Sequence, residues 1–369
     1  MTTGSLLLLS MVSTMSFTAL TGNVETQSTP TPLTTLQEII YDKQEEPKPT
    51  LTLVDIKEPP VSYNLREAPF ISQTYNNCGP AAMSMLFSTY NLQVSQGELA
   101  SIMRPYNTPL GGDDDKSVFP DEFVATAKDY GFESLYRPNG DINLLKQLVA
   151  NDIPVVIRTW LNPGEDVGHY RIIRGYDDTS KVFIQDDSYQ GKGLVYSYED
   201  VVSMWKPFNY SYILVYPKEK KAVVEAILGE DIDRETAYRN ALTRANSELK
   251  KDKNDFYAEF NRSTAFYHLG DTKNAVMSYD KAKDRLPDRI LWYQYEPLYA
   301  YQKEERYDRV FQIAEGILNN GNRAYSELYQ MRGEIYLDRG EVESARKEFE
   351  LALRYNVNFE PAKKALEKI

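Results

Sequence analysis

The sequence contains one cysteine and two histidines in 369 residues. A single thiol cannot form a disulfide within the chain, a Cys-x-x-Cys redox pair or a zinc site built from several thiolates. The two histidines, His169 and His268, stand far apart in the sequence and leave few ligands for a transition metal. We therefore expect neither a metal nor another cofactor.

Positive charge is also scarce, since 42 Lys and Arg face 54 Asp and Glu and leave a formal net charge of −12. Nucleic-acid binding requires a basic face against the phosphates, and no such cluster stands out, so we expect no nucleic-acid partner. No apolar run reaches the about 20 residues that a membrane-spanning helix needs, so no integral membrane span is expected. The mean hydropathy of −0.52 is typical of soluble globular proteins.

An apolar run over residues 6–20 suits the core of a secretory signal, although no Lys or Arg precedes it. Asn23 stands where a lipoprotein signal would carry its cysteine. Residues 25–60 are rich in Thr, Pro, Glu and Lys, a composition that buries too little apolar surface to fold. We expect a signal-like leader over residues 1–24, a linker over residues 25–60, and an extracellular or envelope-associated location.

Residues 61–218 mix helical and strand patterns. Helical spacing covers residues 79–90 and 119–130, and Asp141 is placed to cap a further helix. Strand-like runs follow at residues 154–160, 169–176, 181–185 and 210–216. Helices first and strands later predict an α+β fold with an antiparallel sheet.

Residues 219–369 have helical spacing throughout and a period of 35 residues. Four sets of apolar or small residues recur at this spacing: Phe266, Tyr301 and Tyr336; Ala275, Val310 and Ala345; Tyr279, Ala314 and Phe349; Ala282, Ile317 and Ala352. The last unit resembles the tetratricopeptide repeat, a family of paired antiparallel helices, and the middle unit departs most from it. We expect an all-α tetratricopeptide-type repeat domain over residues 219–369, with residues 359–369 as its capping helix.

The sole cysteine, Cys78, directly precedes a good helix start, Gly79-Pro80-Ala81-Ala82. At a helix N-terminus the macrodipole and the free amides stabilise a thiolate, which prepares a thiol for nucleophilic attack. Gln73 lies five positions earlier, so its side-chain amide and the backbone N–H of Cys78 could form a two-donor oxyanion hole. This context favours a reactive thiol over a buried structural one.

A nucleophilic thiol needs a base with a pKa near neutrality. His169 heads a predicted strand and is the only histidine outside the repeats. The next strand, if it pairs antiparallel with the first, returns beside His169 and ends in Asp186-Asp187. Either carboxylate could orient the imidazole, and the other would serve in a cap or a turn.

Three motifs resemble cysteine peptidase family 39, which has a papain-like fold and includes bacteriocin-leader-processing domains. They are Gln73-x4-Cys78-Gly79-Pro80-Ala81-Ala82, the Gly168-His169-Tyr170 strand with Gly175-Tyr176-Asp177, and the loop Asp187-Ser188-Tyr189. The resemblance covers about residues 66–216 and implies a papain-like cysteine peptidase domain over residues 61–218. It implies Cys78 as nucleophile, His169 as general base, Asp187 as orienting acid and Gln73 as oxyanion donor. Transporter-linked members often have Asp before the cysteine, where this chain has Asn77.

We therefore predict cysteine-dependent hydrolysis of amide bonds in a peptide or protein substrate, with the helical repeats recruiting a protein partner or the substrate. Two alternatives use the same sequence features: a non-catalytic adaptor that binds peptides, and an acyltransferase with an amine acceptor in place of water. The helices could instead support the catalytic domain structurally. Residues 111–116 resemble a calcium loop only weakly, because the ligand spacing and a closing Glu are missing.

Overall fold

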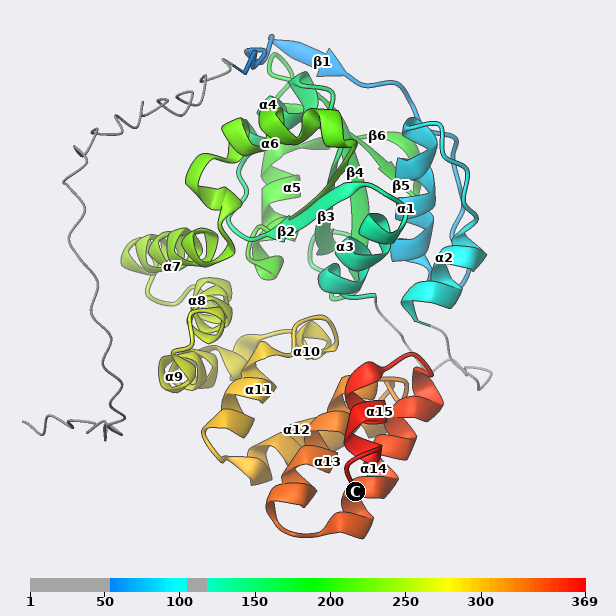
Figure 1. Cartoon of the computed structure of the whole chain (residues 1–369). Helices are drawn as coiled ribbons and strands as arrows, with labels where there is room; N and C mark the ends of the chain where they lie inside the picture. The colour runs from blue at the N-terminus through cyan, green and yellow to red at the C-terminus, as the bar shows by residue number, and fades with distance from the viewer. Residues whose placement is uncertain (1–53, 105–117) are drawn as a thin grey trace, which may run out of the picture. The chain divides into compact units, whose positions relative to one another are not determined.

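A computed structural model describes residues 54–104 and 118–369 (Figure 1). The expected leader, most of the expected linker and the weak calcium-loop pattern at residues 111–116 lie outside the described residues. The described residues belong to one compact unit, in which a mixed α/β part is followed by an all-helical part.

Within the described residues, seven strands form one antiparallel sheet, as the sequence predicts. Their bounds are β1 Ser62–Asn64, β2 Glu133–Arg137, β3 Val155–Trp160, β4 Gly168–Asp177, β5 Val182–Asp187, β6 Gly191–Ser197 and β7 Tyr212–Tyr216. The strand order is β2-β7-β3-β4-β5-β6, and β1 pairs with β4 outside this series. The strands that the sequence pattern missed are β1, β2 and β6.

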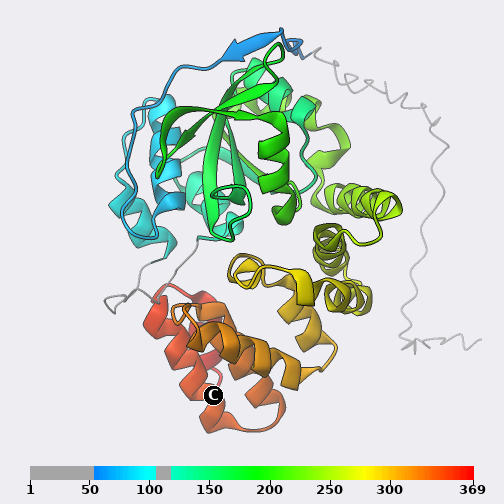
Figure 2. The same cartoon turned by 180° about the vertical axis from the view of Figure 1, so that it is seen from behind.

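Helices cover both faces of the sheet (Figures 1 and 2). On one face lie α1 Cys78–Thr89, α2 Gln96–Met103 and α3 Pro120–Asp129; on the other lie α4 Ile142–Ala150, α5 Tyr198–Trp205 and α6 Lys221–Leu228. The central strand β3 feeds both cores, because successive strand residues point to opposite faces. Val156 packs under the first set of helices, whereas Val155 and Ile157 pack under the second.

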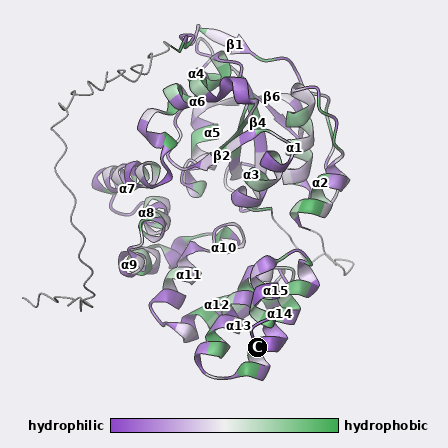
Figure 3. Cartoon of the chain, viewed as in Figure 1, coloured by the Kyte–Doolittle hydropathy of each residue, from purple (hydrophilic) through white to green (hydrophobic). Residues whose placement is uncertain are grey.

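After β7 the secondary structure is helical to the C-terminus, as predicted. The α-helices of this part are α7 Arg234–Lys251, α8 Phe256–His268, α9 Thr272–Ala282, α10 Ile290–Tyr293, α11 Glu296–Lys303, α12 Tyr307–Asn319, α13 Ser326–Asp338, α14 Val342–Tyr355 and α15 Glu360–Leu366. The 3-10 helices among the described residues are Lys206–Phe208, Lys218–Lys220, Gly229–Ile232 and Lys283–Arg285. Green and purple segments alternate along α12 and α14 in Figure 3, as expected of helices with one buried face. No helix in the described ranges is both long and apolar enough to cross a membrane.

The 35-residue period of the sequence corresponds to repeated helix pairs, α8–α9, α11–α12 and α13–α14, whose members pack against each other. Two residues after the first helix of each pair ends, the backbone is left-handed: φ is 80° at Gly270, 55° at Glu305 and 76° at Gly340. Glycine adopts this conformation freely, whereas Glu305 does so at a steric cost. The recurrence supports a true structural repeat, and its tetratricopeptide identity stays a prediction.

The middle pair is irregular, because α10 and α11 together occupy the place of one helix. The break falls at Gln294-Tyr295, just before Pro297 in the first turn of α11. Proline lacks the N–H that a continuous helix would need there, and its ring clashes with the preceding turn. The break leaves α10 as a separate short helix beside the sheet part of the molecule.

One hydrophobic core joins the sheet part to the helical part. It contains Phe119, Trp160 and Phe208 from the first and Tyr293 and Tyr325 from the second, all of them buried. The Trp160 ring centroid lies 4.7 Å from that of Phe208 and 5.9 Å from that of Tyr293. The helices therefore support the sheet part directly, which agrees with the structural role that the sequence left open for them.

A buried cation also links the two parts. Arg104, only 5% exposed, places Nε 2.9 Å from a carboxylate oxygen of Glu122 in α3, and its Nη2 donates to Glu327 in α13. Its guanidinium lies 4.7 Å from the centroid of the Phe119 ring in the shared core. Burial raises the pKa of Glu122, although the attraction of Arg104 opposes that rise.

Replacing Glu327 by alanine removes an acidic partner of this buried guanidinium. We expect Glu327→Ala to lower the free energy of unfolding by about 2 kcal/mol, the order found for hydrogen bonds to charged groups. Urea titration followed by tryptophan fluorescence measures the loss. The control is Glu235→Ala, whose ion pair with Arg239 is 61% and 65% exposed and should change stability by less than about 0.5 kcal/mol. Equal losses in the two variants would contradict a linking role for Arg104.

Candidate active site

The thiol of Cys78 stands at the first residue of α1. Asn76 turns the chain into the helix with a left-handed φ of 57°, a conformation that Asn adopts more readily than most residues. The side chain of Asn77 donates to Thr74 Oγ1, and no side chain caps the helix. The positive end of the α1 dipole therefore lies at the residue that carries the thiol.

The imidazole of His169 comes from the start of β4, between β3 and β5, and is 4% exposed. Its Nε2 lies 2.8 Å from Oδ1 of Asp187. The same ring hydrogen-bonds the side chain of Cys78, and because Nε2 faces Asp187, Nδ1 is the nitrogen on the thiol side. The thiol, the imidazole and the carboxylate thus form one continuous chain of contacts.

The two neighbouring aspartates at the end of β5 serve different partners, because successive strand residues point to opposite faces. Asp187 Oδ1 faces His169 and also accepts the backbone N–H groups of Tyr189 and Gln190 at 2.8 and 2.9 Å. Asp186 instead pairs with Arg174 at 2.9 Å and accepts the N–H of Gly193 at 2.8 Å. Asp187 is therefore the carboxylate at the imidazole, and Asp186 holds the β5–β6 turn.

Opposing forces set the charges of this chain of contacts. Burial lowers the pKa of His169, but the hydrogen bonds with Asp187 and Cys78 outweigh it and raise that pKa to about 9. Burial raises the pKa of Asp187, yet the contact with His169 holds it below its ordinary value. At neutral pH the site therefore favours an imidazolium between a carboxylate and the sulfur.

Gln73 is tied to the loop that follows β5. Its backbone N–H donates to the carbonyl of Ser188 at 2.9 Å, and the Ser188 hydroxyl donates to Oε1 of Gln73 at 2.9 Å. Because Oε1 accepts the hydrogen bond from Ser188, the Nε2 amide group of Gln73 can donate a hydrogen bond to a bound substrate. Gln73, Cys78 and His169 line one cavity of about 540 Å³ together with Leu161, Val167, Gly168 and Tyr189, among others.

Arg171 is a residue of the site that the sequence analysis did not single out. It is fully buried two positions after His169 on the same strand, with Nε 3.6 Å from Oδ2 of Asp187. Its Nη2 donates to the carbonyl of Leu161 in the cavity wall, and its positive charge helps to keep the pKa of Asp187 low. The available signal was an arginine within an otherwise apolar strand, two residues from the histidine and so on the same face.

The second histidine lies elsewhere. His268 stacks on Tyr238 with ring centroids 4.0 Å apart, and its Nε2 lies 3.3 Å from Glu296. Across the part of the chain that the structure covers, no group of three or more His, Cys, Asp or Glu side chains is arranged to hold a metal ion.

Comparison with protein families places this geometry in a known context. Residues 65–213 match the Peptidase_C39 like family. This Peptidase_C39-like domain holds all four side chains that the sequence predicted for the site, and residues 214–369 lie outside the match. A search of curated proteins returns no similar sequence.

Three solved structures resemble the chain: the peptidase domain of Streptococcus ComA, a bi-functional ABC transporter involved in quorum sensing; a double glycine motif protease from an AMS/PCAT transporter in complex with the leader peptide; and xylellain, a cysteine protease from Xylella fastidiosa. Their identities are 20%, 16% and 12%, and their TM-scores 0.33, 0.31 and 0.35. The matches cover 42%, 42% and 43% of this chain and 100%, 95% and 87% of the others. At these values the neighbours establish no activity for this chain.

The contact between Asp187 and His169 makes a direct prediction about the imidazole. Asp187→Asn removes the negative charge at Nε2, so the pKa of His169 should fall from about 9 by one to two units. Titration of the imidazole NMR signals measures it, with His268 as the internal reference in a chain of two histidines. Asp186→Asn is the matched control and should leave the pKa of His169 unchanged. An equal shift in both variants, or none in Asp187→Asn, would contradict the assignment.

Proposed function

We propose that the chain is a cysteine peptidase, which hydrolyses amide bonds in peptide or protein substrates. The observation that carries the proposal is the chain of contacts from Cys78 through His169 to Asp187, at a cavity within the Peptidase_C39-like segment. A protein that only bound peptides would gain nothing from a buried imidazolium beside its sole thiol, since burying that charge costs free energy.

In the first half of the reaction, the Cys78 thiolate attacks the carbonyl carbon of the scissile amide. The C–N bond then breaks, and the His169 imidazolium gives its Nδ1 proton to the leaving amine. A thioester between Cys78 and the acyl half of the substrate remains. Asp187 stays ionised and holds Nε2–H, which aims Nδ1 at the sulfur and at the leaving group.

In the second half, a water molecule attacks the thioester carbonyl. His169, now neutral, takes the proton of that water as the carbon–sulfur bond breaks and the thiolate re-forms. In both halves negative charge develops on the carbonyl oxygen. Gln73 Nε2 and the backbone N–H of Cys78 are the proposed donors to that oxygen, and Ser188 keeps the amide of Gln73 oriented.

The first test removes the thiol. Cys78→Ala should abolish both labelling by iodoacetamide and cleavage of a random peptide library, because no second cysteine is present to replace it. Gln73→Ala is the comparison variant: it should keep labelling but lose about 10²- to 10³-fold in kcat, the usual effect of one oxyanion donor. Mass spectrometry of the labelled protein measures the modification of Cys78, and mass spectrometry of the peptide products measures cleavage. Cleavage that persists in Cys78→Ala would refute the proposal.

The second test is the pH profile. Hydrolysis needs the His169 imidazolium as proton donor to the leaving amine, so kcat/KM should fall about tenfold per pH unit above the pKa of about 9. Labelling by the uncharged reagent iodoacetamide needs only the thiolate and should not fall over the same range. Hydrolysis that stays constant up to pH 10.5 would exclude His169 as the proton donor, whereas parallel loss of both signals would indicate unfolding.

A further inference from the structure

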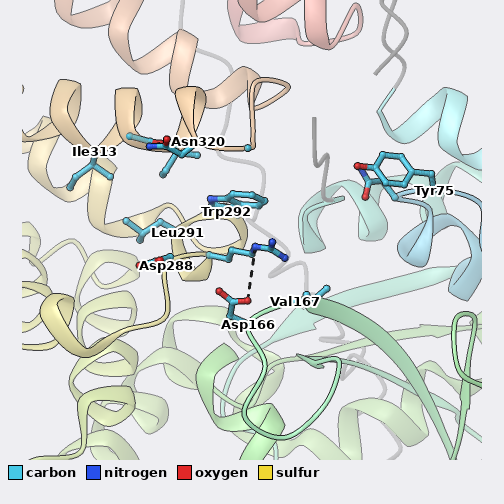
Figure 4. A pocket seen from close by; sticks show the side chains of 13 residues that line it. Tyr75, Asp166, Val167, Asp288, Leu291, Trp292, Ile313 and Asn320 are labelled. Atoms are coloured by element: carbon cyan, nitrogen blue, oxygen red, sulfur yellow. Dashed lines mark hydrogen bonds and ion pairs between the residues drawn. The ribbon is translucent and has the colours of Figure 1, made fainter. Parts of the chain in front are cut away.

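A second cavity, of about 960 Å³, adjoins the candidate active site, and its lining is drawn in Figure 4. Tyr75, Asn76 and Val167 line both this cavity and the one that holds Cys78 and His169. Tyr75 and Asn76 form the turn that leads into α1, and Val167 stands two residues before His169. The two cavities are therefore parts of one cleft that begins at the thiol.

The far wall of the second cavity belongs to the irregular middle pair of helices. Figure 4 shows Leu291, Trp292 and Ile313 on that wall, opposite Val167. These helical residues lie outside the 65–213 segment that matches the family model. The wall is thus a property of this chain beyond its Peptidase_C39-like domain.

Two glycines shape this wall. Gly316 of α12 occupies the position that Lys281 and Leu351 hold in the other two units, and a Cβ built there meets no atom within 4 Å. Glycine within a helix is less stable than alanine, so this position gives up stability where it opens the cavity. Gly321, with φ +116°, lets the following loop lie against Trp292, where a Cβ would come within 3.0 Å of the ring.

The lining combines an apolar floor with an acidic rim. The floor is formed by two residues of the far wall, Leu291 and Ile313, together with Ile317, and it supplies aliphatic surface. At the rim Arg289 lies over Trp292 at 5.1 Å and 4.0 Å from Asp166, so its charge is already matched. The exposed carboxylate of Asp288 has no ion-pair partner among residues 54–104 and 118–369. The rim therefore carries a surplus of negative charge.

We propose that this second cavity is a substrate subsite that binds an extended stretch of polypeptide beside the scissile bond. The floor takes an apolar side chain, and Asp288 pairs with an adjacent Lys or Arg of the substrate. The inference rests on the proposed peptidase function and extends it, because it assigns the helical segment a direct part in choosing the substrate. Remote contacts of this kind raise kcat/KM for peptides long enough to reach them.

Gly316→Leu tests the floor. The variant copies Leu351 of the last unit into open space, so the fold should hold and the melting temperature should stay the same or rise. The leucine nevertheless fills the cavity, so cleavage of long peptides in a random library should fall at least about tenfold. Iodoacetamide labelling of Cys78 should not change.

Asp288→Lys tests the rim. Wild-type cleavage sites should show Lys or Arg next to an apolar residue at one fixed distance from the scissile bond. The variant should lose that preference by about tenfold, since the reversal removes an attraction and adds a repulsion of similar size. The matched control is Glu315→Lys, which makes the same charge change at an exposed position of α12 outside the lining. The control should keep the preference.

Binding separates the subsite from the chemistry. The Cys78→Ala protein, with and without Gly316→Leu, is used to retain peptides from the same library. Retention of apolar-basic peptides that Gly316→Leu abolishes supports the subsite, even if the wild-type chain cleaves nothing and the proposed function fails. Two results would overturn the subsite and leave the peptidase proposal standing. One is cleavage by the wild-type chain with no preference for Lys or Arg next to an apolar residue. The other is peptide retention and cleavage that do not change in Gly316→Leu and Asp288→Lys.

Discussion

The contact between His169 and Asp187 is the constraint on which the candidate site depends. Both side chains are buried, and burial alone would push the imidazole and the carboxylate toward their neutral forms. Their 2.8 Å contact reverses both tendencies, with help from two backbone N–H groups and from Arg171. The positive charge that His169 places beside the thiol therefore depends on the β4–β5 register, because that register brings Asp187 and not Asp186 to the imidazole ring.

Much of the backbone was predictable because its signals are local. The helix start after Cys78, the Asp141 cap and four strands follow from residues within a few positions of one another, and the structure contains each of them. The choice between Asp186 and Asp187 is different in kind. It depends on which face of the sheet each of the two side chains takes, and the sequence of β5 before the β5–β6 turn does not indicate that face.

The missed features depend on contacts across the sequence. The strands β2 and β6 pair with partners that the local pattern does not specify, and Arg171 gains meaning only once β5 brings Asp187 beside it. The period of 35 predicted helix pairs, but not that Pro297 would divide the middle one. That irregular unit is also the one that faces the site, so the weakest match to the repeat pattern contributes the wall of the second cavity.

The core shared by the sheet part and the helical part has a consequence for the order of events during synthesis. Arg104 and Glu327 are 223 positions apart in the sequence, and Tyr293, which packs on Trp160, follows it by 133 positions. A growing chain therefore exposes aromatic surface on its finished sheet until Tyr293, 77 residues beyond the end of β7 at Tyr216, has emerged. Contacts of such long range form late, because closing a long loop costs entropy before the contact repays it. The nascent protein must pass through an aggregation-prone stage that a self-contained domain would avoid.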